Sequence, residues 1–318
     1  MGQKKVNELK VGSIITYINL IISTIIPLLY TPVMLRILGQ EEYGLYSLSN
    51  SVISYLTLLN LGFGTAIIRF ISKFRIEGDH DKIEGVTGLI LSIYGIIAII
   101  VCIVGFLLTK GTGLFFGTGL TVNEIQRLKI LMVIMTVSTA ISFPVSVLSS
   151  VSVAYEKYIF RKMVDMIATI ATPILNLIVL FLGYASIGLA MIGLGIQLIY
   201  GIIFIWYCKQ KLNVVPRFKD MPFYMVKEIL GFSIYVFASS IIDMLYWATD
   251  KVLIGAVLGT VAVAVYNIGG TFTSMLQNMS SAISGVFGTR VNMMVFGNQP
   301  MEKLSELLIR IGRLQYYI

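Results

Sequence analysis

Long apolar segments alternate with short polar ones along the whole chain. A helix needs about 20 apolar residues to cross the roughly 30 Å hydrocarbon core of a bilayer, and these segments are long enough. The strands of a membrane β-barrel would instead alternate apolar and polar side chains, whereas residues 89–108 read LILSIYGIIAIIVCIVGFLL. The pattern therefore predicts an all-α, polytopic integral membrane protein. The predicted helices cover 11–38, 43–68, 86–109, 128–150, 164–183, 187–208, 229–257 and 262–288, and a ninth begins near 304.

The composition agrees with this prediction. Of the 318 residues, 57% are hydrophobic and only 13% are charged, and the mean hydropathy is +0.87. A soluble domain has about 25% charged residues, so a soluble enzyme is excluded. With the N-terminus inside, seventeen Lys and Arg residues fall in inner loops and four in outer ones. The net charge of +8 is therefore typical of positive cytoplasmic loops rather than of nucleic-acid binding, and we expect a multi-pass protein of the cell membrane with a cytoplasmic N-terminus.

A repeated pattern links the first and last thirds of the chain. Leu38-Gly39 is followed by Tyr46 seven residues after the glycine, and Leu258-Gly259 is followed by Tyr266 at the same spacing, an offset of 220 residues. Six predicted helices separate the two copies, so both enter the membrane from the same side. This indicates a parallel repeat, with two lobes related by an axis along the membrane normal.

The repeat divides the chain into two predicted units. Residues 1–227 form an N-terminal lobe of six transmembrane helices and an inner loop, and residues 228–318 begin a second lobe with helices seven, eight and part of nine. Under the repeat, Ile318 corresponds to Ala98, in the middle of the third helix. We therefore expect this sequence to be a piece of a protein with about twelve or more helices, its second lobe truncated.

Two stretches carry a family resemblance: TPVMLRILGQEEYGLYSLSNSVISYLTLLNLGFGTAIIRF at 31–70 and ATDKVLIGAVLGTVAVAVYNIGG at 248–270. With the basic N-terminus, they resemble the polysaccharide biosynthesis (export) proteins, the flippases for lipid-linked oligosaccharides of the multidrug/oligosaccharidyl-lipid/polysaccharide exporter superfamily. The turn at 38–44 and the Asp-Lys pair before Ile-Gly at 250–255 contribute most. One departure is Ala264, where the second copy usually has glycine.

The resemblance implies a fold, a cargo and partners. The fold would have two six-helix lobes around a central cavity that opens alternately to each side without ATP hydrolysis. The cargo would be a polyprenyl-pyrophosphate-linked oligosaccharide repeat unit for O-antigen, capsule or exopolysaccharide synthesis. The implied partners are this lipid-linked oligosaccharide, membrane lipid, and a polysaccharide polymerase or glycosyltransferases, with no nucleic acid.

Charged residues inside membrane helices are candidates for function, because each costs roughly 2.5–3.5 kcal/mol near the helix centre. The predicted seventh helix contains Asp243, Trp247, Asp250 and Lys251. In a continuous helix Asp243, Trp247 and Asp250 share one face. We expect the two carboxylates to couple a cation, and Trp247 and Lys251 to contact substrate. The alternative is that Asp250 and Lys251 lie at the outer water boundary and that Asp243 pairs with another helix.

Arginines are candidates for binding the pyrophosphate, because a guanidinium donates two parallel hydrogen bonds to phosphate oxygens. Those at or near membrane depth are Arg36, Arg69, Arg290, Arg310 and Arg313. Arg69 and Arg290 close the second and eighth predicted helices, and Arg310 and Arg313 share a face of the ninth. The alternative is that such arginines reach lipid headgroups or follow the positive-inside rule.

The sequence indicates no cofactor, metal or catalytic centre. The only histidine is His80, the cysteines Cys102 and Cys208 form no spaced set, and the glycine-rich segment 111–119 is predicted to be an outer loop rather than a phosphate loop. Two alternatives to a flippase remain: a cation-coupled multidrug exporter of the same superfamily, and, less favoured, an integral-membrane glycosyltransferase.

Overall fold

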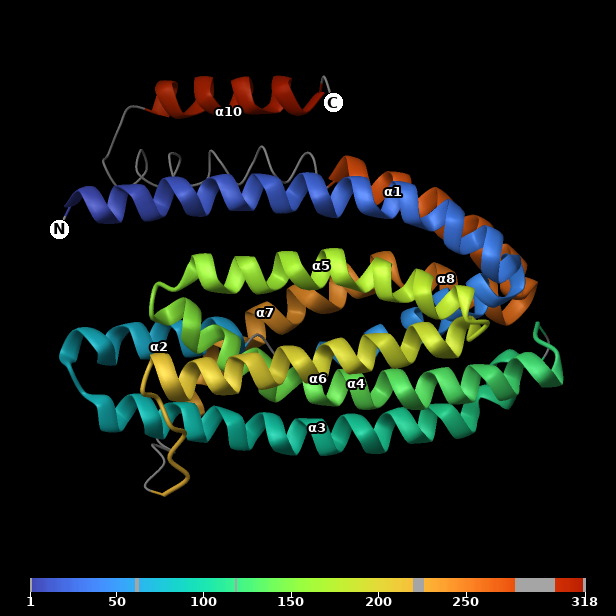
Figure 1. Ribbon diagram of the computed structural model, residues 1–318, viewed down its shortest axis with the longest axis horizontal. Coiled ribbons are helices and arrows are strands. Elements are labelled where there is room, and N and C mark those ends of the chain that lie inside the picture. The colour runs from blue at the N-terminus through green and yellow to red at the C-terminus, as the bar shows by residue number, and fades with distance from the viewer. Residues whose placement is uncertain (1, 61–62, 118, 220–225, 278–300, 317–318) are drawn as a thin grey trace.

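The computed structural model describes residues 2–60, 63–117, 119–219, 226–277 and 301–316, and within them it contains helices and no strand (Figure 1). Residues 260–277 are also helical. The remaining elements, in chain order, are α1 (Gly2–Ser54), the 3₁₀ helix η1 (Tyr55–Asn60), α2 (Phe63–Glu77), α3 (His80–Phe116), α4 (Val122–Ala154), α5 (Tyr158–Phe181), α6 (Ala185–Lys211), α7 (Val226–Trp247), α8 (Thr249–Leu258) and α10 (Met301–Tyr316).

Gly39, which has a positive φ, separates the first two predicted helices inside α1. Gly39 has φ 79° and ψ 166°, a conformation that a side chain disfavours, so the chain turns sharply there. Gly259, between α8 and the helix 260–277, has φ 82° and ψ −176°. These are the two glycines of the predicted repeat, and they share one backbone conformation. The parallel two-lobe repeat itself stays a prediction.

The predicted second helix, 43–68, is not continuous. The α-helix ends at Ser54, η1 follows, and α2 begins at Phe63. The buried Tyr94 of α3 holds this interruption, because its hydroxyl donates to the main-chain oxygen of Asn60 at 2.9 Å and also to the Asn60 side chain. Tyr94 packs against Phe63 and Phe143, with ring centroids 5.6 and 5.7 Å apart. The break is therefore anchored in the core.

The helices α3, α4, α5 and α6 run side by side along the long axis of the molecule (Figure 1). The core is centred on α4, which packs against α3 and α6. Near the C-terminus of α4, the side chains from Val145 through Val153 are buried, apart from that of Ser146. Large apolar side chains face outward instead, as lipid-facing residues do: Ile99, Ile103, Leu107, Ile167, Ile178, Ile202 and Trp206.

Five helical segments of the described residues are long and apolar enough to cross a membrane: Ile21–Asn60, His80–Phe116, Val122–Ala154, Tyr158–Phe181 and Ala185–Lys211. Two predictions need correction. Residues 111–116 continue α3 rather than forming a loop, because the helix does not stop at its glycines. The predicted span 229–257 is divided at Ala248, where φ is −108° and ψ −30°.

Candidate functional site

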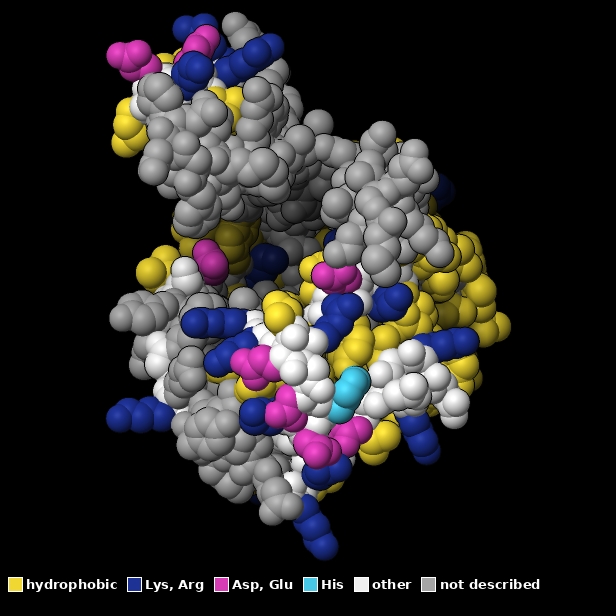
Figure 2. All heavy atoms as spheres, turned by 90° about the vertical axis from the view of Figure 1, so that its left-hand side faces the viewer, with side chains coloured by type: hydrophobic (Ala, Val, Ile, Leu, Met, Phe, Trp, Pro, Cys, Tyr) yellow, Lys and Arg dark blue, Asp and Glu magenta, His cyan; other side chains and the backbone are white. Residues whose placement is uncertain are grey.

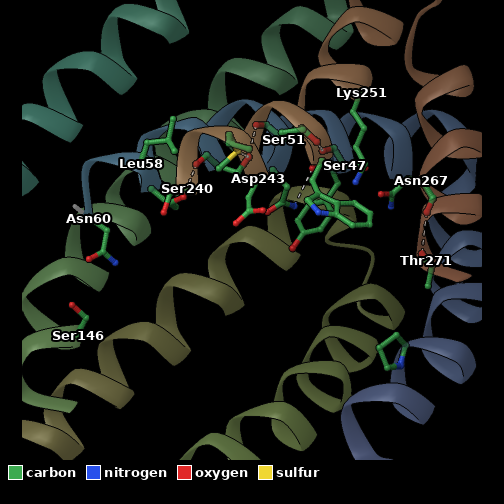
Figure 3. Close-up of a pocket in the computed structure, with 18 of the residues that line it drawn as sticks. Ser47, Ser51, Leu58, Asn60, Ser146, Ser240, Asp243, Lys251, Asn267 and Thr271 are labelled. Atoms are coloured by element: carbon green, nitrogen blue, oxygen red, sulfur yellow. Dashed lines mark hydrogen bonds between the residues drawn. The ribbon is translucent and has the colours of Figure 1, made fainter. Parts of the chain in front are cut away.

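A cavity of about 1100 Å³ lies between the two predicted lobes. The described residues that line it fall within 27–161 in the first lobe and within 240–271 in the second. Its walls come from α1, η1, α2, α4, α5, α7, α8 and the helix 260–277. Figure 3 shows Asn60, Ser146, Asp243 and Asn267 on four of these walls. The cavity is therefore lined by both predicted lobes rather than enclosed in one of them.

The lining is polar for a protein with this hydropathy. Fifteen of its twenty-six residues carry a hydroxyl or amide: Thr31, Tyr43, Tyr46, Ser47, Asn50, Ser51, Ser54, Thr57, Asn60, Ser146, Ser149, Ser150, Ser240, Asn267 and Thr271. Polar side chains at membrane depth are costly unless they have partners or line a wet space. The lining therefore suits a ligand rich in hydrogen-bonding groups.

The repeat pattern extends to the lining itself. At the offset of 220 residues, Pro27 corresponds to Trp247, Thr31 to Lys251, Ser47 to Asn267 and Ser51 to Thr271, and all eight line the cavity. The first copy thus supplies small neutral side chains. The second supplies the indole ring and the ammonium group at two of these positions.

Three of the predicted residues of the seventh helix come together at the cavity. Asp243, Trp247 and Lys251 line it, four residues apart along α7 and α8 (Figure 3 labels Asp243 and Lys251). Asp250 does not line it; its carboxylate accepts a hydrogen bond from the Tyr266 hydroxyl at 2.5 Å. Of the predicted shared face, Asp243 and Trp247 therefore lie at the cavity and Asp250, which follows the boundary between α7 and α8, does not.

The predicted arginines lie elsewhere among the described residues. Arg36 on α1 and Arg69 on α2 are exposed, and neither belongs to the cavity lining. Arg310 and Arg313 are exposed on α10, which lies at one edge of the molecule (Figure 1). Arg290 lies outside the described residues. Their expected contacts with pyrophosphate are therefore untested.

Sequence reasoning missed Arg161, the one arginine among the described residues of the cavity lining. It was counted only as an inner-loop charge. Its Nε lies 3.9 Å from the carboxylate of Asp165, one turn along α5, and that carboxylate also accepts a hydrogen bond from the Tyr200 hydroxyl at 2.5 Å. The neutral polar residues of the lining did have a signal in the sequence. Two serine-rich segments, 47–54 (SLSNSVIS) and 146–152 (SVLSSVS), contribute many of them.

Close packing brings α1, the turn between α3 and α4, α8 and the start of the helix 260–277 together at four glycines, which we call the glycine seal: Gly44, Gly119, Gly255 and Gly259. A Cβ added to Gly44 would overlap the main-chain oxygen of Thr260. At Gly119 a Cβ would lie 2.7 Å from the main-chain oxygen of Gly255, and at Gly259 it would lie 2.7 Å from that of Gly119. These glycines let segments of both predicted lobes meet without side chains between them.

Polar contacts accompany the glycine seal. Glu124, in the first turn of α4, accepts hydrogen bonds from the Thr260 hydroxyl at 2.6 Å and from the main-chain N–H of Thr121 at 2.8 Å. Nearby, Glu42 of α1 pairs with Arg127 of α4 and accepts from the Ser186 hydroxyl. The seal is therefore reinforced by carboxylates that the N-terminal lobe supplies.

The opposite end of the molecule carries the charged turns (Figure 2). Lys and Arg side chains gather there around His80, together with acidic ones. Arg217 pairs with Asp81 at 2.9 Å. Asp79 caps α3, and its hydrogen bonds with Lys82 lower the pKa of the Asp79 carboxyl. No group of three or more His, Cys, Asp or Glu side chains suited to a metal ion occurs within the described ranges.

Solved structures define the class of fold. A MOP superfamily transporter from Pyrococcus furiosus is 16% identical, with a TM-score of 0.65 over 87% of this chain and 64% of that one. A multidrug resistance MATE family transporter in an outward-facing conformation is 18% identical, with a TM-score of 0.65 over 95% and 68%. A MATE in complex with MaD3S is 16% identical, with a TM-score of 0.63 over 87% and 65%. This is the fold of MOP superfamily transporters.

A family assignment follows from the sequence. The model of the polysaccharide biosynthesis protein family matches residues 9–287, most of the chain. The chain therefore belongs to the polysaccharide biosynthesis protein family, and the resemblance seen at 31–70 and 248–270 is confirmed. The chain spans 64–68% of the length of the solved transporters it resembles. Among curated protein sequences, none matches it.

Proposed function

We propose that this protein is a flippase that moves polyprenyl-pyrophosphate-linked oligosaccharide repeat units across the cytoplasmic membrane for the synthesis of O-antigen, capsule or exopolysaccharide. The observation that carries the proposal is the cavity of about 1100 Å³ between membrane helices, whose described lining includes fifteen residues with a hydroxyl or amide group. Ligand pockets for small molecules measure about 300–1000 Å³ and are mostly apolar. This cavity is at the upper end in size, and its lining carries many more hydroxyl and amide groups than such pockets usually do, which suits several sugar rings.

The same lining weighs against the two alternatives. A multidrug exporter binds apolar drugs and would benefit from an apolar, aromatic cavity. A glycosyltransferase would need an acidic or histidine-containing catalytic pair beside a donor site, and Asp243 is the only carboxylate in the cavity lining described here. Both alternatives stay open to experiment, but neither accounts for fifteen hydroxyl and amide side chains.

The proposed cycle places the glycine seal on the outer side, since the N-terminus is expected in the cytoplasm. The substrate enters from the cytoplasm, and the sugar moves into the cavity while the polyprenyl tail stays in lipid. The lobes then rock, the seal opens, and the saccharide leaves on the outer side. Gly44 and Gly259 meet partners across the seal, so opening it breaks few side-chain contacts.

Residues of the cavity have distinct roles in this proposal. Trp247 stacks on a sugar ring, and Lys251 and Arg161 hold phosphate oxygens as cationic donors. Asp243 binds a coupling cation that resets the lobes, and one charge crossing the membrane is worth about 2.3 kcal/mol per 100 mV. Asp250 keeps a structural role through Tyr266.

The decisive experiment asks which leaflet holds the lipid-linked repeat unit. In cells that lack the gene encoding this chain, we expect the repeat unit to accumulate on the inner leaflet, inaccessible to an external lectin or glycosidase that cannot cross the membrane. A plasmid copy of the gene should restore access. Normal outward exposure without the gene, in cells with no second flippase, would refute the proposal, and drug-efflux assays would then test the exporter alternative.

The coupling role of Asp243 has its own test. Asp243→Asn keeps the size of the side chain and removes its charge, so transport should fall and lose its dependence on pH or on the coupling cation. Asp250→Asn is the matched control, because Asp250 does not line the cavity. If Asp243→Asn transports like the unmodified protein at every pH, the coupling role is wrong, although the flippase proposal can stand.

A further inference from the structure

Half of the twelve hydroxyl groups in the described lining use their hydrogen on the protein itself. Six of them donate to a main-chain oxygen three or four residues earlier in the chain, at 2.6–3.1 Å: those of Ser51, Ser54, Thr57, Ser146, Ser149 and Thr271. A hydroxyl has one hydrogen to donate and two lone pairs that accept. With the hydrogen committed to the helix, each oxygen presents lone pairs to a ligand.

Two amides in the lining behave in a similar way. Asn50 donates from its side-chain nitrogen to the main-chain oxygen of Tyr46 at 3.1 Å, and Asn267 donates to the Tyr43 hydroxyl at 2.6 Å. Of the neutral side chains in the lining, a majority therefore direct a hydrogen toward protein. The helical hydroxyl groups of the lining therefore offer a ligand acceptors rather than donors.

Charge in the cavity is scarce. The described part of its lining has two cationic side chains, Arg161 and Lys251, and one carboxylate, Asp243. Arg161 already lies beside Asp165. The pyrophosphate of the proposed cargo is itself strongly anionic and would occupy the cationic groups. A carboxylate on the sugar would then face oxygen lone pairs and Asp243, with no cation left to pair with it, and an unpaired charge is costly to remove from water.

We propose that the saccharide carried by this protein is uncharged and rich in donors, that is, built from neutral hexoses or acetamido sugars, and that the lining discriminates against uronic acids. Sugar hydroxyls and acetamido N–H groups donate to the lone pairs that the helices leave available. A carboxylate only accepts. This inference rests on the proposed function and specifies the substrate class of the same cavity.

A binding measurement with two matched lipids tests this inference. The first probe is a polyprenyl pyrophosphate bearing a neutral disaccharide, and the second is the same lipid with C6 of the terminal sugar oxidised to a carboxylate. The chain has two tryptophans, and Trp206 faces outward with 54% of its surface exposed. In a Trp206→Phe background, the fluorescence of Trp247 therefore reports occupancy of the cavity. We expect the acidic probe to bind at least tenfold more weakly than the neutral one.

A gain of binding provides the complementary test. Asn50 is exposed to the cavity, so Asn50→Lys adds a cation there, and Asn50→Gln is the neutral control. The ratio of the affinities for the neutral and the acidic probe should fall at least tenfold in the lysine variant relative to the glutamine variant, whatever either substitution does to the absolute affinities.

The outcomes separate the two proposals. Equal binding of both probes, or preference for the acidic one, by the protein with Asn50 intact overturns the inference and leaves the flippase proposal standing. Binding of neither probe removes the proposed function and the inference together. Because this comparison requires no change in the cavity lining, it decides the matter even if the lysine variant does not fold.

Discussion

Substitution of Gly44 by alanine should weaken the glycine seal. Gly44 lies in α1 just after the turn at Gly39, and its α-carbon faces the backbone of the second lobe. An added methyl group would overlap the main-chain oxygen of Thr260, a contact with backbone rather than with the end of a flexible side chain. The methyl group fits only if the two segments separate, which is the movement that opens the outer side in the proposed cycle.

The size of the effect follows from the nature of the contact. Forcing an extra carbon into a well-packed contact costs about 1–3 kcal/mol. The cost applies to the sealed state alone, since the methyl group has no neighbour once the segments part. An energy difference of this size shifts a two-state equilibrium by about 5- to 150-fold. We expect Gly44→Ala to raise the population of the outward-open state by a factor in this range.

Cysteine labelling from outside measures that population. In a chain with Cys102 and Cys208 replaced by serine, Thr31→Cys places a reporter in the cavity lining. A maleimide that cannot cross the membrane should label it at least fivefold faster when Gly44→Ala is present. Gly193→Ala on α6 is the matched control, because a Cβ there meets nothing within 4 Å.

Two results would refute this reasoning. Labelling of the Gly44→Ala variant no faster than the control would mean that the contact does not hold the cavity closed. Faster labelling accompanied by a matching fall in the unfolding temperature would indicate general loosening of the fold rather than opening of the seal. The thermal unfolding of both variants should therefore be measured beside the labelling rates.

Three further predictions concern stability. Tyr94→Phe removes the two hydrogen bonds to Asn60 and should lower the free energy of unfolding by about 1–3 kcal/mol, measured by denaturant titration; an unchanged value would mean that η1 needs no anchor. Thr121→Ala removes the capping box of α4 and should cost about 1 kcal/mol in the same assay. Asp79 has a lowered pKa because of Lys82, so its contribution to stability is full above the pKa of the unfolded state and fades as the pH falls through the lower pKa of the folded state. Asp79→Asn should abolish that part of the acid dependence, and an identical pH profile of thermal unfolding would contradict it.

Hydrophobic patterning was sufficient for the class of fold and for the position of most helices. Length and apolarity alone specify where a helix crosses the bilayer, because every backbone polar group must be satisfied internally there. The interruptions were not predictable in the same way. The segment 55–60 is as apolar as its surroundings, and its 3₁₀ geometry depends on Tyr94, which is 34 residues away in the chain. The break at Ala248 has no proline or glycine to indicate it.

The candidate site was predictable only in part. The spacing of Asp243 and Trp247 on one helix was enough to place both together, since periodicity holds within a single helix. The orientation of Asp250 depended on the interruption that follows Trp247. Arg161 was missed because a positive charge near the cytoplasmic end of a helix is already explained by the positive-inside rule. Whether such a side chain faces the cavity is decided by the rotation of α5 against its neighbours, which a one-dimensional pattern does not contain.

The length of α3 gives a practical means of finding the orientation of the protein. Its 37 residues span roughly 55 Å at 1.5 Å per residue, so the helix is nearly twice as long as the bilayer core is thick. Its end near Gly113, where a Cβ meets nothing within 4 Å, therefore stands in water together with the start of α4. An epitope inserted beside Gly113, before the turn that carries Gly119 of the glycine seal, would be read by antibody from one face of the cell alone.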